Sequence, residues 1–461
     1  MGNRCSKKRV LPFSLPYGHN QSQDNNLGVD FYWACRNGNL QTVIDIYPRL
    51  TYEQLNEIQP NGSTALHDAC ARNHPHIVKY LLDNGCCRTT LNSQHQTAYE
   101  LASEEIKRLF DRPWSQRFVQ ERGADLFQDR PSGDTQNQQI ERPDDWVTGR
   151  TGDYSTYEAQ FMLALEQSSS IFKNIVKKRL ERNHNEELLN LLNKSIAPTN
   201  PQHRTAKDLI DKFLNKLGVH HLITLYTLET DFYKNLKQEA DALTAILYLN
   251  LKELQNRAFK GRAYRGAGMT ESDLDAYRWA LQKKETWHDN LLETRILQSL
   301  SIKKSVALEF AKKSFGANLF SVLIEFEFPE CCPTAISLFK ISNQLPGLSD
   351  YEDEAEVLLL PFTLFKLQDI KADLEQREYR IFLKHQQTPK ESLRQAAGEG
   401  SVWVFAVRTR VQFENPSEAN YCQKLVYNMA FGCILAQYGI IGLALCLTAC
   451  CFALVKICDR D

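Results

Sequence analysis

Three short groups of residues in the second half of the chain carry side chains that could act together chemically. A guanidinium stands in Tyr264-Arg265-Gly266, two hydroxyls in Ser299-Leu300-Ser301 and two carboxylates in Glu354-Ala355-Glu356. A guanidinium can bind phosphate through two parallel hydrogen bonds, and a carboxylate can stabilise positive charge that develops in a transition state. Each group alone also has a purely structural explanation: Arg265 could form a surface salt bridge, Ser299 could cap a helix, and the two glutamates could lie at a solvated strand end. Their joint occurrence in this order indicates one site.

The spacing of the two glutamates adds a geometric expectation. Residues i and i+2 on a β-strand lie on the same face, and the apolar run Val357-Leu358-Leu359-Leu360-Pro361 follows directly. We therefore expect Glu354 and Glu356 side by side at an exposed strand end. Glu352 has the same parity, but it precedes the motif and is expected in a loop.

Hydrophobic spacing indicates the elements that must position these groups. Amphipathic segments predict a helical lobe, and apolar runs predict strands in the half that follows. The first motif is expected to end a strand, and the second to lead into a helix through Ser305 and Phe310. The sequence therefore predicts an α+β fold. The helical segments are 206–217 and 232–254, and the strands include 319–328, 355–360, 379–383 and 402–407.

An internal repeat lies upstream of this region. Thr64-Ala65-Leu66-His67-Asp68-Ala69 is followed by a related group that begins at Thr97, 33 positions after Thr64. Over residues 29–110 this resembles the ankyrin repeat, which implies a short α-solenoid of two or three repeats. We interpret His67 as a structural histidine that ties adjacent turns, not as a catalytic base.

The three motifs resemble the arginine-specific mono-ADP-ribosyltransferases of the R-S-E class. The order of the motifs carries the resemblance, together with Glu354-Ala355-Glu356-Val357-Leu358-Leu359-Leu360-Pro361 and the upstream Tyr226-Thr227-Leu228-Glu229-Thr230-Asp231-Phe232-Tyr233. The match covers residues 205–410 and implies a catalytic domain with a helical lobe and a mixed β-sheet core. It also implies NAD as the substrate that donates ADP-ribose, protein arginine side chains as acceptors, and no metal.

The resemblance assigns three residues to NAD binding. Arg265 would bind the phosphates, the backbone at Gly266 would approach the nicotinamide amide, and Phe310 would stack on the nicotinamide ring. These residue types suit NAD, because it brings a pyrophosphate and a glycosidic bond to a cationic leaving group.

The resemblance assigns three further residues to the reaction itself. Ser299 would position the catalytic carboxylate of Glu356, which would hold a ribose hydroxyl and stabilise the developing cation. Glu354 would bind the acceptor arginine. Leu300 replaces the threonine that the family usually has in the middle motif, although that side chain has no assigned catalytic role.

Two other functions remain as alternatives. The chain could be a catalytically inactive ankyrin adaptor at a membrane, although the four polar residues Arg265, Ser299, Glu354 and Glu356 are all present. It could also be an NAD glycohydrolase that passes ADP-ribose to water, which only an assay separates from transfer.

Length and composition narrow the class of protein. The 461 residues suggest two or three domains, and 55 basic against 56 acidic residues give no field that would recruit nucleic acid. The 13 cysteines have no metal-ligand spacing and fit reduced thiols. We expect a protein that binds other proteins and no nucleic acid, with the repeats docking a protein partner.

Both ends of the chain predict membrane attachment. The start Met1-Gly2-Asn3-Arg4-Cys5-Ser6 fits an acylation pattern, in which Gly2 would carry myristate and Cys5 would carry palmitate. Basic residues follow, and we expect residues 1–28 to form an acylated basic arm. Residues 429–455 contain no charge and are long enough for a transmembrane helix. We therefore expect a cytosolic catalytic domain. The remaining expected parts are a polar linker at 111–155, a helical connector at 156–204, a juxtamembrane segment at 411–428 and a tail at 456–461.

Overall fold

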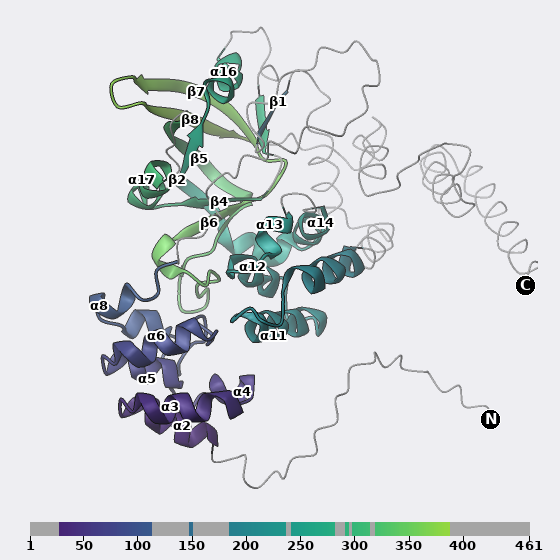
Figure 1. Cartoon of the computed structure of the whole chain (residues 1–461). Coiled ribbons are helices and arrows are strands. Elements are labelled where there is room, and N and C mark those ends of the chain that lie inside the picture. The colour runs from purple at the N-terminus through teal and green to yellow at the C-terminus, as the bar shows by residue number, and fades with distance from the viewer. Residues whose placement is uncertain are drawn as a thin grey trace, which may run out of the picture. The chain divides into compact units, whose positions relative to one another are not determined.

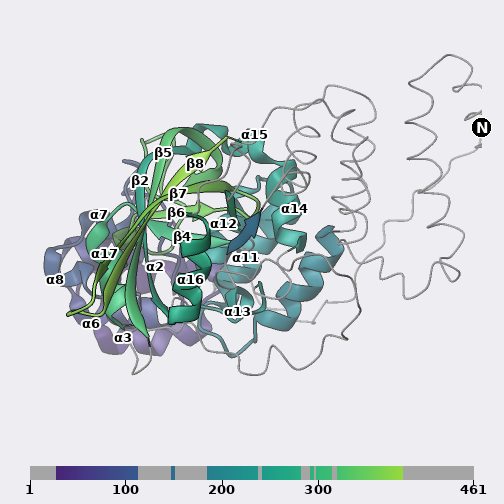
Figure 2. The same ribbon diagram turned by 90° about the horizontal axis from the view of Figure 1, so that it is seen from above.

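The computed structural model of the chain describes residues 27–112, 147–150, 184–236, 241–281, 291–294, 297–313 and 319–387. Figures 1 and 2 show it from two directions. The contacts within the chain divide it into two compact units, Met1–Phe110 and Asp111–Asp461. The described part of the first unit has its own apolar core, and the second has one core in its helices and one in its sheet.

Short helices build the described part of the first unit, and three of them have a threonine cap. Thr51, Thr64 and Thr97 each accept a hydrogen bond from a backbone N–H of the helix that follows, and each forms a reciprocal capping box. The helices are α2 (Leu27–Arg36), α3 (Leu40–Ile46), η1 (Tyr47–Arg49), α4 (Tyr52–Leu55), α5 (Ala65–Ala71), α6 (Pro75–Asp83), α7 (Ala98–Leu101) and α8 (Glu104–Lys107).

His67 connects two neighbouring repeats, as expected. Its Nδ1 lies 2.7 Å from the hydroxyl of Thr64, and its Nε2 lies 3.0 Å from the carbonyl oxygen of Gln96. The side chain is buried, and burial lowers the pKa of the imidazole. The structural interpretation of His67 is confirmed.

The second unit contains a helical lobe, as the sequence predicted. Residues 184–195 are helical, and apolar side chains of the lobe pack with residues of two strands, including Ile336 and Leu358, in one core. Figure 1 shows these helices beside the sheet. They are α11 (His203–Leu214), α12 (His220–Thr227), α13 (Phe232–Leu236), α14 (Asp241–Leu249), α15 (Leu251–Leu254) and η3 (Gln255–Arg257).

A mixed sheet packs with the helical lobe in the second unit, in the order β1-β3-β7-β8-β5-β2-β4-β6, and β5 also pairs with β6. The pairing of β5 with β8 is parallel, whereas the other pairings are antiparallel. The strands are β1 (Val147–Arg150), β2 (Ala258–Met269), β3 (Leu291–Thr294), β4 (Gln298–Ser301), β5 (Phe320–Ser337), β6 (Glu356–Leu359), β7 (Leu364–Asp373) and β8 (Glu378–Gln386). Helices α16 (Glu271–Trp279) and α17 (Lys304–Lys313) both contact β2.

Several expected elements differ in extent from the observed ones. The motif around Arg265 lies within β2, which continues to Met269, so it does not end the strand. Strand β5 runs on to Ser337, well beyond the predicted 319–328, because its later residues pair with the start of β2 and its last residues, 335–337, pair with β6. Residues 147–150, expected in a polar linker, form a strand that pairs with β3. The polar composition of the linker concealed this strand.

Other expectations concern residues outside those that the structure describes. They include the acylated arm with Gly2 and Cys5, most of the connector at 156–204, the strand at 402–407 and the transmembrane helix at 429–455. Within the described ranges, no helix is both long enough and apolar enough to cross a membrane.

Candidate active site

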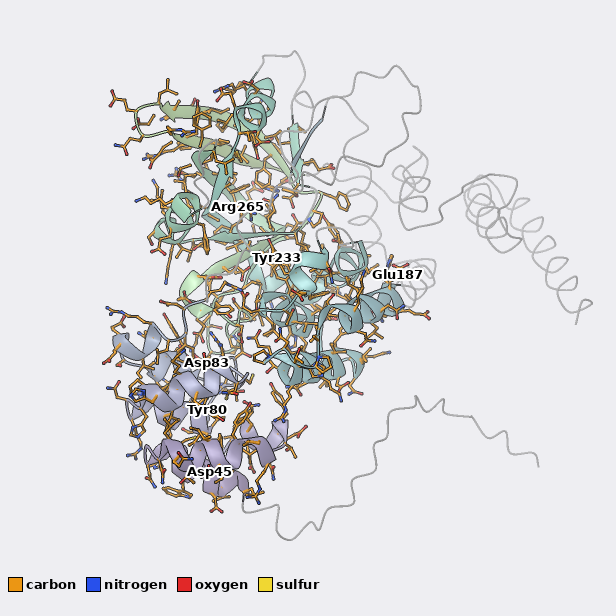
Figure 3. All side chains as sticks on the ribbon, viewed as in Figure 1. Asp45, Tyr80, Asp83, Glu187, Tyr233 and Arg265 are labelled. Carbon is orange, nitrogen blue, oxygen red and sulfur yellow. The ribbon has the colours of Figure 1, made fainter. Side chains whose placement is uncertain are left out.

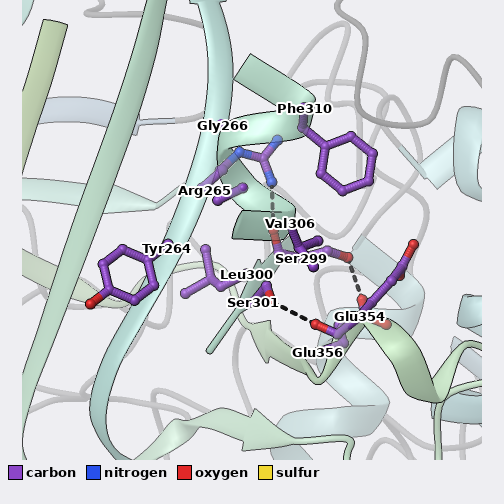
Figure 4. A pocket seen from close by; sticks show the side chains of 11 residues that line it. Tyr264, Arg265, Gly266, Ser299, Leu300, Ser301, Val306, Phe310, Glu354 and Glu356 are labelled. Carbon is purple, nitrogen blue, oxygen red and sulfur yellow. Dashed lines mark hydrogen bonds between the residues drawn. The ribbon is translucent and has the colours of Figure 1, made fainter. Parts of the chain in front are cut away.

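Strand pairing brings the three sequence motifs together. Strand β4 lies between β2 and β6, with Tyr264 opposite Ser301 on one side and Glu356 opposite Ser301 on the other. The serines of the second motif therefore lie between the arginine of the first and the glutamate of the third. Arg265, Ser299, Glu354 and Glu356 all line one pocket (Figure 4).

Hydroxyl groups hold the carboxylate of Glu356 at both of its oxygens. Ser299 donates to Oε1 over 2.5 Å, and Ser349 donates to Oε2 over 3.1 Å. The hydroxyl of Tyr226, on α12, lies 3.2 Å from that of Ser299. Glu356 is only 1% exposed. These contacts orient the carboxylate and desolvate it without neutralising its charge.

Arg265 is buried and lines the same pocket as Glu356. Its Nη1 donates to the carbonyl oxygen of Ser299 over 3.0 Å, which ties β2 to β4 at the pocket. Figure 3 places Arg265 on the sheet and Tyr233 on the helical lobe. A buried guanidinium beside an open pocket is suited to bind an anion such as a phosphate.

Gly266 is required by the packing of α17 on β2. A Cβ at this position would lie 1.9 Å from the carbonyl oxygen of Ala307 and 2.5 Å from the backbone nitrogen of Ala311. Any larger residue would push the helix away from the strand. Because α17 also carries Phe310 into the lining of the pocket, Gly266 fixes the distance of that ring from the sheet.

Phe310 and Leu300 lie in different surroundings. Phe310 is partly exposed and lines the pocket on the same side as Arg265, across from the two glutamates in Figure 4. Leu300 is 2% exposed and belongs to the apolar core of the sheet. Side chains alternate along β4, so Leu300 extends away from the face that carries Ser299 and Ser301. The leucine in the middle motif therefore contributes to the core.

The expectation that Glu354 and Glu356 share one strand face is wrong. Glu354 ends a 3-10 helix, η4 (Glu352–Glu354), and only Glu356 belongs to a strand. Ala355 between them has φ 45° and ψ 56°, a left-handed conformation that turns the chain. The expected exposed strand end is also wrong, because Glu354 is 5% exposed.

The carboxylate of Glu354 is bound by an arginine that the sequence analysis did not assign to the site. Nε of Arg112 lies 2.7 Å from Oε1 of Glu354, and Nη2 lies 3.1 Å from Oε2. Glu229 accepts a hydrogen bond from Nη1. Burial alone would lower the pKa of Arg112, but the two carboxylates outweigh it and hold that pKa well above its ordinary value.

The candidate site thus includes three residues for which the sequence predicted no role: Arg112, Ser349 and Tyr226. A sequence signal for Tyr226 does exist, since this residue begins the segment that resembles the family's helical lobe. Arg112 and Ser349 lie in segments without a hydrophobic period, and no local pattern marks them.

Comparison with known proteins accounts for the first unit. A family model described as ankyrin repeats, in three copies, matches residues 31–111. The NAD-capped RNA hydrolases NUDT12 of Macaca fascicularis and Homo sapiens are each 48% identical to this chain over 82 residues, which are 18% of this chain and 18% of the relative. That similarity falls in the ankyrin region alone. The predicted ankyrin repeats are confirmed.

Three solved structures are similar to the chain at low TM-scores. Vis toxin, an ADP-ribosyltransferase from Vibrio splendidus, is 19% identical, covers 49% of this chain and 90% of its own, and has a TM-score of 0.22. The ADP-ribosyltransferase HopU1 of Pseudomonas syringae is 16% identical, covers 33% of this chain and 55% of its own, and scores 0.23. The type III effector XopAI of Xanthomonas axonopodis is 13% identical, covers 50% and 94%, and scores 0.31. Because these scores are low, the function proposed next rests on the geometry of the site.

Proposed function

We propose that the second unit is a mono-ADP-ribosyltransferase that cleaves NAD and transfers ADP-ribose to an arginine side chain of a protein, releasing nicotinamide. The observation that carries this proposal is the pair of hydrogen bonds that Ser299 and Ser349 donate to the two carboxylate oxygens of Glu356. Glu356 and Arg265 line the same pocket.

This arrangement suits the cleavage of a glycosidic bond to a cationic leaving group. As the bond to nicotinamide breaks, positive charge develops on the ribose, and the oriented charge of Glu356 stabilises it. Arg265 supplies a fixed cation for the pyrophosphate, and Phe310 supplies an aromatic face for the nicotinamide ring. Glu354, at the same pocket, is the group that would receive an arginine guanidinium.

One observation favours NAD glycohydrolysis as a second function. Both oxygens of Glu354 already accept hydrogen bonds from Arg112. While Arg112 binds Glu354, an acceptor arginine cannot bind the same carboxylate oxygens. A water molecule that attacks the ribose does not need this carboxylate. Hydrolysis would then dominate until the carboxylate is released.

The test is an assay of the full chain with NAD labelled in its adenosine part and agmatine, a small guanidine, as acceptor. Transfer predicts labelled agmatine together with free nicotinamide in equal amounts. Free nicotinamide with labelled ADP-ribose alone would establish the glycohydrolase instead. Neither product would leave the inactive adaptor as the better description.

We further propose that the repeats dock the protein to be modified. Deletion of residues 29–110 should reduce labelling of the natural protein target, while labelling of agmatine persists, since a small acceptor needs no docking. Equal loss with both acceptors would show that the repeats only support the catalytic unit.

We also propose that Gly2 and Cys5 are acylated, that residues 429–455 cross a membrane and that the catalytic unit faces the cytosol. The glycan acceptor patterns that begin at Asn20, Asn61 and Asn193 provide a test. A cytosolic location predicts no mobility shift of the native protein on glycosidase treatment, and a shift would contradict it.

A further inference from the structure

Arg112 occupies a site whose groups are all complementary to a guanidinium. Two of its nitrogens bind Glu354, and Nη1 donates to Glu229 and, over 3.3 Å, to the carbonyl oxygen of Thr227. The ring of Tyr351 lies 3.8 Å from its Cζ, within the range of a cation–π contact. Two carboxylates, a carbonyl and an aromatic face therefore surround one cation.

This site is built by the catalytic unit and filled by a residue from the start of that unit. Thr227 ends α12 and Glu229 follows that helix, whereas Tyr351 precedes η4 and Glu354 ends it. Arg112 is 242 positions before Glu354 in the chain. The side chain of Arg112 is 5% exposed, so the guanidinium has lost its water shell and depends on these partners.

The bidentate geometry has a consequence for any second arginine. A planar guanidinium binds a carboxylate best through two parallel hydrogen bonds, and Arg112 makes both of them to Glu354. An acceptor arginine that sought the same two oxygens would compete with Arg112 for them.

From this geometry we infer that Arg112 is an internal ligand of the acceptor site, held where the guanidinium of a substrate arginine binds, and that an acceptor must displace it before transfer. The site comprises Glu354, Glu229, Tyr351 and the carbonyl of Thr227, and its ligand class is an arginine side chain or another alkylguanidine. This inference rests on the proposed function, because only that function gives Glu354 an arginine to bind.

The first measurement is the steady-state kinetics of agmatine labelling by the Arg112→Gln variant of the full chain. With an internal competitor, the apparent KM of an acceptor is its intrinsic KM divided by the fraction of time that the site is empty. A competitor that leaves the site empty for about a tenth of the time or less raises KM roughly tenfold or more, so its removal should lower the KM for agmatine by that factor. The ratio of transfer to hydrolysis should rise with it. Arg112→Lys keeps the charge but loses the two parallel hydrogen bonds, so its KM for agmatine should lie between those of the parental chain and Arg112→Gln.

Arg257→Gln is the matched control. Arg257 is also a buried arginine, 6% exposed, but it donates to the carbonyl oxygens of Ser337 and Pro346 and contacts neither glutamate. Its loss should lower the melting temperature without changing the KM for agmatine. An unchanged or higher KM in Arg112→Gln would overturn the inference and make Arg112 a positioning residue for Glu354.

A binding measurement tests the site without catalysis and remains useful if the glutamine variant folds poorly. Ethylguanidine should raise the melting temperature of Arg112→Ala in a concentration-dependent way, because it refills the vacated site, and should leave the parental chain unchanged. No shift in Arg112→Ala would contradict the inference, even if the parental chain labels agmatine. A shift in a chain that neither transfers nor hydrolyses would instead reject the proposed function and leave only a guanidinium site.

Discussion

The two glutamates of the third motif have opposite electrostatic surroundings. Glu356 accepts its hydrogen bonds from the hydroxyls of Ser299 and Ser349, which orient the carboxylate and leave its charge in place. Glu354 is bound by the guanidinium of Arg112, which neutralises it. In the proposed reaction, the carboxylate that meets a transient cation is held by neutral hydroxyls, and the carboxylate that recognises a cationic acceptor is already bound by a guanidinium.

Loss of the charge on Glu356 should have the largest effect. Glu356→Gln keeps the shape of the side chain but removes the charge that stabilises the ribosyl cation, so transfer and hydrolysis should fall together by on the order of a hundredfold or more. Nicotinamide release and label transfer measure the two rates. Full NAD cleavage in this variant would remove Glu356 from its proposed role.

Glu354→Gln should separate the two reactions. Transfer to agmatine should fall steeply because the acceptor loses its charged partner, while nicotinamide release into water persists. The variant should also melt at a lower temperature, since the buried guanidinium of Arg112 loses the charge of one of its carboxylate partners while Glu229 remains. Transfer at the parental rate would show that Glu354 does not bind the acceptor.

Ser349→Ala should have a smaller effect on the same reaction. It frees Oε2 of Glu356 while Ser299 still holds Oε1, so both rates should fall roughly tenfold, in line with the loss of one hydrogen bond of about 1–1.5 kcal/mol. Ser342→Ala is the control, because the hydroxyl of Ser342 accepts only from the backbone of Leu345 among the described contacts. Equal activity of the two variants would contradict a positioning role for Ser349.

The smallest expected effect concerns the stability of the turn that carries Glu354. Burial, followed by the charges of Glu354 and Asp111, raises the pKa of Asp353 to about 6 from 3.8. The folded chain therefore binds this proton more tightly than the unfolded chain, and its stability falls as the pH rises from about 4 to about 6.

Asp353→Asn removes this penalty and should raise the free energy of unfolding at pH 7 by roughly 1–3 kcal/mol, with no gain near pH 4. Thermal unfolding across the pH range measures the difference. Asp369→Asn, at an exposed position on β7, is the control. A gain that is equal at all pH values would exclude Asp353 as its source.

The sequence predicted the parts of the site that follow local patterns. The ankyrin period, the helical lobe and the strand-to-helix step from Ser299 to Phe310 all come from spacing along the chain, and the structure has each of them. Strand pairing then brings Arg265, Ser299 and Glu356 together.

What the sequence did not predict depends on contacts between distant segments. Alternation suggested one strand for both glutamates, but the loop before β6 is shaped by its tertiary partners, including Ser301, which donates to the carbonyl oxygen of Glu354 over 2.6 Å. Arg112 stands in a polar stretch with no period, and its partner lies 242 positions away. Patterns of neighbouring residues contain no information on such a pair.

The left-handed residue between the two glutamates also bears on how such a site changes by mutation. Because Ala355 turns the chain between η4 and β6, a substitution of the Glu354 side chain leaves the register of β6 against β4 unchanged. Under the proposed roles, the residue that selects the acceptor can therefore change by substitution without altering the residue that supports NAD cleavage. In the proposed transferase, a substitution in the turn could thus select a different acceptor while the step of NAD cleavage is kept.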